Sequence, residues 1–414
     1  MRRIILLIFG VWLLLVFPGV ARSMGPEDVV EQGIASVDNG IDWLRQRRTF
    51  NMNGVPYGLT GMPIVFYTPS SGFHYGGWIE VANYKVRPYR YRFNAQWWLT
   101  TEGMRNHHIR VEAPRIWRLP VNVRFLTRDL KNTGANFFGI GNDTEINQRQ
   151  LRNEPDYYRY LLEQQRTGID IETNLFGGLS FFCGLRFNRA IPTRIDQTKN
   201  TYFVFLMPSD EVPGREAGWS NFFAIGLILD KRNDEEIPTE GTITEFSMQN
   251  SYSRLGSDYR YKRYTLLHTN YLPLRPQWVM VNRLVVERLS GMIPFYEMTE
   301  FGGSIRVFEI GESASLRGYE SRRFADRQKA YWTTEFRRLF KTRKVFGQYL
   351  LAQANVFTDV GRVAPKFSEL RLSDLHYDVG AGFRVTWNTQ LSIRTDYAVS
   401  PEDRKVLVNF GLLF

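Results

Sequence analysis

The chain has 414 residues, of which 43% are hydrophobic and 15% aromatic, and its formal net charge at pH 7 is +11. The mean hydropathy of −0.32 excludes a bundle of transmembrane helices, because each such helix would need roughly 20 consecutive apolar residues. So many aromatic residues exclude a disordered chain, and the single cysteine, Cys183, excludes an intramolecular disulfide framework.

Residues 1–23 have the layout of a secretory signal peptide. Met1-Arg2-Arg3 gives a positively charged start, residues 4–16 are almost entirely apolar, and Ala21-Arg22-Ser23 resembles a cleavage site. The alternative is an uncleaved anchor helix, but the apolar stretch is short and a cleavage-like sequence follows it. We therefore predict export, with cleavage after about Ser23.

The next segment, 24–61, is predicted to be a periplasmic or lumen-plugging helical segment. Over residues 27–48, apolar side chains recur at spacings of four and three, which places them on one face of a helix: Val30, Ile34, Val37, Ile41 and Leu44. Such a helix could plug the lumen of a barrel, bind a periplasmic partner or act as a tether. The sequence leaves these three roles open.

After Gly54 the pattern changes to an alternation with a period of two, which is typical of β-strands and continues to the end of the chain. The predicted barrel comprises residues 62–414. The last stretch shows it best, because one face carries Val406, Val408, Phe410, Leu412 and Phe414, and the other carries Lys405, Asn409 and Gly411. Elsewhere the polar face carries charged side chains and the apolar face carries aromatic ones. This favours a transmembrane barrel, with lipid outside and water inside, over a soluble sandwich.

Sixteen alternating segments can be placed, near 62–68, 74–84, 88–101, 107–113, 117–128, 157–174, 178–190, 218–231, 243–253, 259–272, 277–291, 328–340, 345–359, 376–386, 389–398 and 405–414. Short connections between these segments, such as 341–344, alternate with long connections at about 129–156, 192–217 and 292–327, as in outer-membrane barrels. The predicted fold is therefore all-β: a 16-stranded antiparallel transmembrane β-barrel with a short N-terminal helix.

Three motifs occur in order in the second half of the chain: Leu316-Arg317-Gly318-Tyr319 in a long loop, Thr333-Thr334-Glu335-Phe336-Arg337, and Phe357-Thr358-Asp359-Val360-Gly361. In this order and spacing they resemble motifs of the BamA/TamA superfamily of outer-membrane barrels, also known as bacterial surface antigens, which includes the two-partner-secretion transporters. The sequences 137–144 and 226–230 and the terminal Phe414 are also similar to that family. The resemblance covers roughly residues 62–414.

The resemblance implies that the loop carrying Arg317 folds back into the lumen. Periodicity places Glu335 and Asp359 on the lumen faces of neighbouring strands, where one guanidinium can bind both through charge-assisted hydrogen bonds. We expect Arg317 to hold the loop in this way, with Gly318 allowing close approach of the backbone and with Tyr319 and Gly361 completing the structural site. The alternative is that Arg317 is a solvated loop charge.

The resemblance also implies that the C-terminal residues Phe410, Leu412 and Phe414 form the signal by which the barrel-assembly machinery recognises its substrates. Other expected partners are outer-membrane lipid, lipopolysaccharide and a separately encoded periplasmic protein. Nucleic acid is not expected, because the positive charge is spread over lumen-facing strand positions and loops. We predict no enzymatic activity, cofactor or metal site, since the sequence lacks Gly-x-Ser-x-Gly and His-Glu-x-x-His motifs.

By resemblance, the protein is expected in the bacterial outer membrane, with a role in protein translocation or membrane insertion. The segment 24–61 departs from the assembly factors, because it is too short for their periplasmic polypeptide-transport-associated domains. The first and last strands, near 62–68 and 405–414, are expected to pair weakly and to open laterally, with Pro63 limiting the pairing. The alternative is a passive porin or a structural surface antigen with no translocation activity.

Overall fold

The computed structural model describes residues 49–411, apart from the gaps 69–71, 87–88, 115–120, 197, 199–201, 209–210, 235–236, 304–307, 310–314, 346–347 and 388–390. The predicted signal peptide (1–23), the predicted helix (27–48) and the C-terminal residues Leu412 and Phe414 lie outside the described residues. For Phe410, the backbone alone is described.

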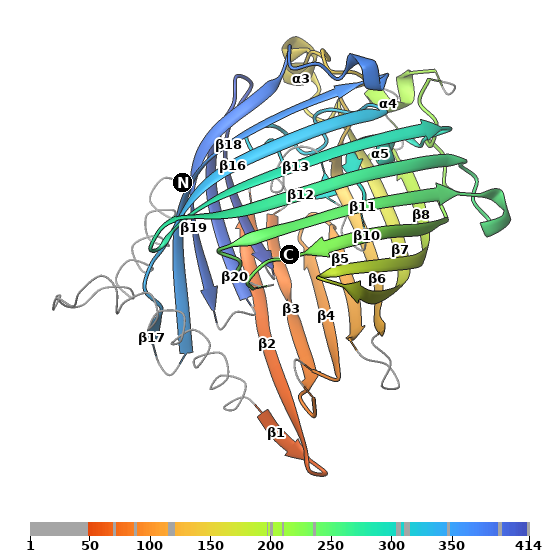
Figure 1. Ribbon diagram of the computed structural model, residues 1–414. Helices are drawn as coiled ribbons and strands as arrows, with labels where there is room; N and C mark the ends of the chain where they lie inside the picture. The colour runs from red at the N-terminus through yellow and green to blue at the C-terminus, as the bar shows by residue number, and fades with distance from the viewer. Residues whose placement is uncertain are drawn as a thin grey trace. The chain divides into compact units, whose positions relative to one another are not determined.

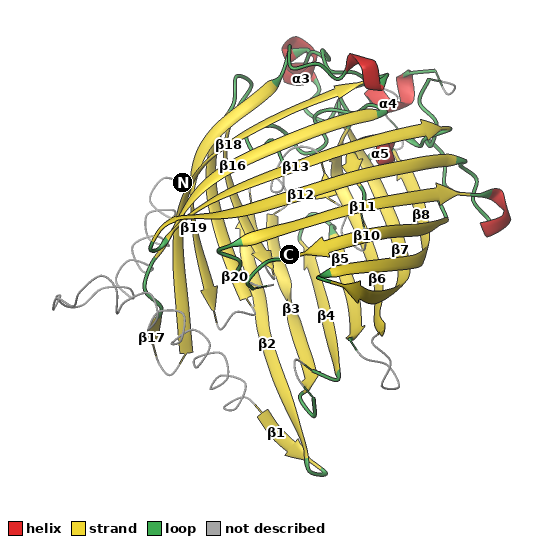
Figure 2. Cartoon of the chain, in the orientation of Figure 1, coloured by secondary structure: helices red, strands yellow, loops and turns green. Residues whose placement is uncertain are grey.

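One antiparallel sheet contains nearly all of the regular structure, and each long strand pairs with the long strands before and after it in the chain (Figures 1 and 2). The long strands are β2 (Val55–Thr68), β3 (Gly72–Asn83), β4 (Tyr91–Thr100), β5 (Arg105–Ala113), β6 (Val121–Asn136), β7 (Arg159–Phe176), β8 (Leu179–Thr193), β10 (Phe222–Asp230), β11 (Gly241–Ser251), β12 (Tyr261–Arg275), β13 (Trp278–Gly291), β16 (Gln328–Leu339), β18 (Gln348–Ala364), β19 (His376–Trp387), β20 (Leu391–Val399) and β21 (Arg404–Gly411).

Shorter elements extend this sheet or lie in its connections. The sheet also contains β1 (Thr49–Met52), β9 (Gly218–Trp219) and β17 (Arg343–Val345), while β14 (Glu300–Phe301) and β15 (Phe308–Glu309) form a separate pair. The helices are α3 (Gln148–Asn153), α4 (Phe203–Leu206) and α5 (Phe295–Met298), with 3-10 turns η1 (Ser253–Leu255) and η2 (Phe367–Glu369). Within the described part of the chain, no helix is both long enough and apolar enough to cross a membrane.

The antiparallel all-β fold is confirmed, since every predicted segment overlaps one of the long strands. The predicted start of the sheet at residue 62 is too late, because β1 and the first part of β2 occupy 49–61, where we expected a helical segment. Asn53 and Gly54 have φ angles of 52° and 74°, the left-handed pair that a two-residue hairpin requires. This hairpin joins β1 to β2 and places residue pairs such as Met52 and Val55 opposite each other.

The first long strand, β2, is therefore not short, and Pro63 lies well inside it. Pro63 is opposite Gly77 in the register with β3. A proline has no N–H to donate, so it removes one possible ladder hydrogen bond without ending the strand. Pro63 thus weakens this strand locally, which is a smaller effect than we expected from the sequence.

The two faces of the sheet differ in chemistry. On β16, Trp332 and Phe336 are 53% and 41% exposed, whereas Glu335 between them is buried. On β18, exposed Val356 and buried Asp359 show the same alternation. We call the face of Trp332, Phe336 and Val356 the outer face and the face of Glu335 and Asp359 the inner face. An apolar outer face and a charged inner face are what a membrane barrel needs.

Long connections pack on the inner face and form two apolar clusters there. In the first, Phe295 and Tyr296 of α5 pack with Phe137 and Tyr160. The members of the second are Val285, Phe301, Leu316, Tyr319, Phe324, Tyr331 and Val363. Both clusters contain residues of the connection from β13 to β16, residues 292–327, which therefore lies against the inner face.

If the outer face contacts lipid, the cost of placing a charge on it should depend on how deep in the bilayer the charge lies. Leu284 lies on the outer face near the middle of β13, and Trp278 is at the start of the same strand. We expect Leu284→Arg to lower the free energy of unfolding by about 2–4 kcal/mol, and the charge in Trp278→Arg to cost about 0–1 kcal/mol, since the penalty falls towards the interface. Urea titration in lipid vesicles measures both, and equal losses would contradict the assignment.

Candidate functional site

The connection from β13 to β16 contacts the inner face through two arms. The first arm comprises residues 292–303 and contains α5 and β14, while the second comprises residues 315–327 and contains the Leu-Arg-Gly-Tyr motif. Each arm places charged side chains against buried charges on the strands. We describe the second arm first, because the sequence predicted its contacts.

The guanidinium of Arg317 lies between two carboxylates. Its Nε donates to Oδ2 of Asp359 at 2.8 Å and its Nη2 donates to Oδ1 of the same residue at 2.9 Å. Its Nη1 donates to Oε1 of Glu335 at 2.8 Å. The ring of Phe357 lies beneath it, with the guanidinium carbon 3.3 Å from the ring centroid. Arg317 is therefore not a solvated loop charge, and its side chain is buried.

The register of the strands explains this geometry. Thr333 on β16 is directly opposite Asp359 on β18, and Glu335 follows two residues later on the same face. Tyr331, two residues before Thr333, donates its hydroxyl to Oδ1 of Asp359 at 3.1 Å. Burial by itself would lower the pKa of the Arg317 guanidinium, but Asp359 and Glu335 raise it well above its ordinary value. The guanidinium therefore keeps its charge in the protein interior.

The two glycines of the predicted site allow backbone segments to come close together. The Gly318 N–H donates to Oδ2 of Asp378 at 3.0 Å, and its carbonyl accepts from the Ser400 hydroxyl at 2.8 Å. A Cβ atom on Gly318 would lie 2.8 Å from Cβ of Asp378, which is too close for any side chain. A Cβ atom on Gly361 would lie 3.0 Å from Cδ1 of Leu316. The position of Gly318 therefore favours glycine for steric reasons, whereas a side chain at Gly361 would require the end of the Leu316 side chain to shift by a few tenths of an ångström.

Tyr319 completes this group of residues. It is buried, and its hydroxyl donates to the carbonyl of Tyr377 at 3.2 Å. Burial raises the pKa of the Tyr319 phenol to about 12, so the hydroxyl stays protonated and remains a donor. The structure thus brings together the six residues Arg317, Gly318, Tyr319, Glu335, Asp359 and Gly361, which we call the Arg317 cluster.

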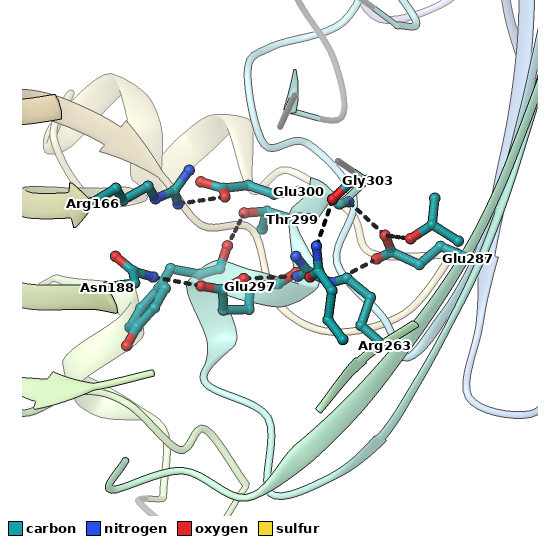
Figure 3. A network of polar contacts seen from close by, with 12 residues as sticks. Arg166, Asn188, Arg263, Glu287, Glu297, Thr299, Glu300 and Gly303 are labelled. Carbon is teal, nitrogen blue, oxygen red and sulfur yellow. Dashed lines mark hydrogen bonds and ion pairs between the residues drawn. The ribbon is translucent and has the colours of Figure 1, made fainter. Parts of the chain in front are cut away.

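The first arm is held by a second group of ion pairs, which the sequence did not predict (Figure 3). Glu297 in α5 accepts from Arg263 Nη2 at 2.7 Å and from Asn188 Nδ2 at 2.8 Å. Glu300 in β14 accepts from Arg166 Nη2 at 2.6 Å and from Arg322 Nη2 at 2.7 Å. We call this the Glu297–Glu300 cluster.

Three further strand residues bind the backbone of the first arm. Glu287 on β13 accepts from the Gly302 N–H at 2.6 Å and forms an ion pair of 2.6 Å with Lys329 on β16. Lys329 also donates to the carbonyl of Glu300. Gln249 on β11 donates to the carbonyl of Gly303 at 2.7 Å. The first arm is therefore bound to six strands, from β7 to β16.

Another pair of contacts joins the second arm to neighbouring connections. Arg323 donates from Nε to Oε2 of Glu402, between β20 and β21, at 2.7 Å and from Nη1 to Thr144 Oγ1, between β6 and β7, at 2.7 Å. Gly141 pairs with Ala325 through an isolated β-bridge. The family-like sequence 137–144 thus lies directly against the second arm.

One sequence signal could have identified part of the Glu297–Glu300 cluster. Arg263, Glu287 and Lys329 all fall at inward positions of predicted strands, where an uncompensated charge would be costly. That pattern predicts partners inside the sheet but does not say which loop residue supplies them. Among the described residues, no group of three or more His, Cys, Asp or Glu side chains is arranged to hold a metal ion.

Residues 115–412 match the Omp85 superfamily domain. Among solved structures, BamA from Haemophilus ducreyi lacking POTRA domains 1–3 is 13% identical with a TM-score of 0.52, covering 86% of this chain and 69% of that chain. CdiB from Escherichia coli is 12% identical with a TM-score of 0.52, covering 97% of this chain and 73% of that chain. At these identities the likeness is one of fold. No curated protein matches the sequence significantly.

Replacing Arg317 with Ala should make residues 315–327 sensitive to protease or lower the yield of folded protein. The substitution leaves two buried carboxylates without their cation, and breaking a buried ion pair typically costs about 3–5 kcal/mol. Arg317→Lys should restore protection only in part, because an ammonium cannot reproduce the fork of hydrogen bonds. Limited proteolysis of the folded protein measures this. Arg371→Ala, at an exposed loop position, is the control, and unchanged protection and yield in Arg317→Ala would contradict the role.

The Glu297–Glu300 cluster leads to a prediction about pH. Burial would raise the pKa of the Glu300 carboxyl, but Arg166 and Arg322 more than offset this and hold it at about 2. Glu300 therefore stabilises the fold in full above its ordinary pKa of 4.5, and this stabilisation is lost as the pH falls towards about 2. The free energy of unfolding should fall by about 3–5 kcal/mol in Glu300→Gln at pH 7, and by much less near pH 2.

Urea titration of both proteins across this pH range tests the prediction. Glu320→Gln is the matched control, because Glu320 forms a 2.8 Å ion pair with Lys405 but is 44% exposed. An exposed pair of this kind contributes about 0–1 kcal/mol. A difference between wild type and Glu300→Gln that is the same at pH 7 and pH 2 would show that the carboxylate charge does not stabilise the first arm.

Proposed function

The chain belongs to the Omp85 superfamily, and from this we propose that it is a bacterial outer-membrane barrel that secretes polypeptides or inserts them into the membrane. The observation that carries the proposal is the family match, which spans residues 115–412 and includes the Arg317 cluster. The fold shared with BamA and CdiB supports it. The apolar outer face supports a location in the membrane, and the predicted signal peptide supports export.

The working parts in this proposal are the inner face, the connection from β13 to β16 and the two ends of the sheet. Within the described residues, no ladder pairing joins β21 to β2. We propose that these two strands form a seam that opens laterally to release a substrate into the membrane. In this proposal, the connection from β13 to β16 blocks a water-filled path along the inner face until a substrate binds.

The two alternatives, a porin and a structural surface antigen, differ in whether the connections between strands must leave the lumen open. A porin needs a lumen that small solutes can cross, whereas here both arms of the connection lie on the inner face, together with residues of the β6–β7 connection. This arrangement favours a regulated passage over a permanently open pore. A structural surface antigen would tolerate the same arrangement, so a cellular experiment has to distinguish it from a transporter. We propose no catalytic role.

The expected partners follow from the same proposal. Lipid would contact the outer face, and lipopolysaccharide phosphates would bind arginines at the rim. The barrel-assembly machinery would recognise Phe410, Leu412 and Phe414. A separately encoded periplasmic protein would deliver the polypeptide substrate.

Depletion of the protein followed by quantitative proteomics tests the proposal. We expect a defined set of outer-membrane or secreted proteins to fall several-fold, because their insertion or secretion depends on this barrel. Wild type and Arg371→Ala should restore them, and Arg317→Ala should not. An unchanged proteome after depletion would contradict the proposal, and together with a large, stable conductance in planar bilayers it would establish a porin.

A further inference from the structure

Two arginines flank an exposed tryptophan on the outer face, at the end of β12, β13 and β16 that carries the short connections. These three strands are neighbours in the sheet (Figure 1). Arg275 is directly opposite Trp278, and Trp278 is directly opposite Arg338. Residues in directly opposite positions lie on the same face of a sheet. The three side chains therefore form a row across three strands, which we call the arginine row.

A register shift in β12 places Arg275 in this row. Pro273 is opposite Val279, so a regular ladder would place Leu274 opposite Trp278, but Arg275 takes that position. A bulge of this kind changes the direction in which the following side chain points. The shift thus puts a guanidinium, instead of an apolar side chain, beside the tryptophan.

The two arginines lack partners of opposite charge. Arg275 and Arg338 are exposed, and neither forms an ion pair or a hydrogen bond with any residue that the structure describes. The guanidinium carbon of Arg338 lies 5.6 Å from the centroid of the Trp278 ring and 5.3 Å from that of Phe340. Such contacts hold a cation against an aromatic face and leave its N–H groups free to bind an anion.

The next row of the outer face, further from the short connections, is wholly apolar. Its members, in register order across β12, β13, β16 and β18, are Leu272, Met280, Phe336 and Val356. Two residues of a strand span about 7 Å. The outer face therefore changes over roughly this distance from guanidinium groups to apolar side chains, with a tryptophan at the boundary. A phospholipid has the same order of chemistry, from its headgroup to its acyl chains.

We propose that the arginine row binds the phosphate of an anionic phospholipid, such as phosphatidylglycerol, whose acyl chains lie along the apolar row. Arg275 and Arg338 are two strands apart, which is about 10 Å, so both side chains can reach one phosphate above the Trp278 ring. Guanidinium groups bind phosphate oxygens through paired, charge-assisted hydrogen bonds.

The side of the membrane and the charge of the row both favour this ligand. Short connections of outer-membrane barrels face the periplasm, where the bilayer leaflet consists of phospholipid. Two cations without carboxylate partners favour a lipid with a net negative charge over a zwitterionic lipid. The site requires the proposed membrane location, but it does not require the proposed role in secretion or insertion.

Native mass spectrometry of the purified full chain in detergent tests the site. Wild type should bind dioleoyl phosphatidylglycerol about tenfold more tightly than dioleoyl phosphatidylethanolamine, because only the first lipid has a net negative charge. A large excess of inorganic phosphate should not displace the lipid, since a free anion makes no contact with the apolar row. Equal affinity for the two lipids, or displacement by inorganic phosphate, would overturn the proposal.

Charge-matched variants assign the preference to the arginine row. The double substitution Arg275→Gln with Arg338→Gln should lower the preference for phosphatidylglycerol about fivefold or more. Arg288→Gln with Arg371→Gln removes the same charge at exposed positions, near the other end of β13 and in the β18–β19 connection, and should bind as wild type does. A preference that the first variant keeps, or that both variants lose equally, would overturn the proposal.

A single substitution keeps the test decisive if the double variant does not fold, which the heat-dependent electrophoretic mobility of the barrel shows. Arg338→Gln alone should lower the preference about twofold or more. A wild-type preference in this variant would then overturn the proposal. Urea titration of Leu284→Arg and Trp278→Arg tests the membrane location separately, so a missing lipid site and a wrong location give different results.

Discussion

Buried ion pairs between the β13–β16 connection and the inner face hold the rest of the structure in place. The connection supplies a cation, Arg317, where β16 and β18 present Glu335 and Asp359, and it supplies carboxylates where β7 and β12 present Arg166 and Arg263. A slip of one residue in any of these strands would move its inward charge to the outer face. The loop contacts therefore require the same strand register as the apolar outer face does.

The two arms of the connection act as one unit because they are bound to each other as well as to the strands. Arg322 on the second arm donates to Glu300 on the first arm, and to the hydroxyl of Tyr160 on β7 at 3.2 Å. Releasing either arm would leave charges of the other arm unpaired in the interior, which is expensive. In the proposed function, a substrate that displaces the connection must thus offer replacement charges, or another change in the protein must drive the displacement.

Much of the fold and of the Arg317 cluster could be predicted from the sequence, because alternation fixes which strand residues face inwards. Glu335 and Asp359 followed from that rule, and the motif around Arg317 supplied their partner. The Glu297–Glu300 cluster could not be predicted in the same way, since Glu297 and Arg263 are brought together by the path of a loop. The hairpin at Asn53-Gly54 had a recognisable turn signal, but β1 is short, and β1 and the first part of β2 were included in a segment expected to be helical.

Hydrogen exchange of the backbone amides in the connection tests the central claim most directly. The N–H groups of Gly302, Arg317 and Gly318 donate to the buried carboxylates of Glu287, Asp359 and Asp378. If the connection is held on the inner face, these amides should exchange as slowly as those of β16, because exchange requires opening of the buried ion pairs. Exchange as fast as that of a solvated loop would show that the connection is not bound there, and would contradict the account.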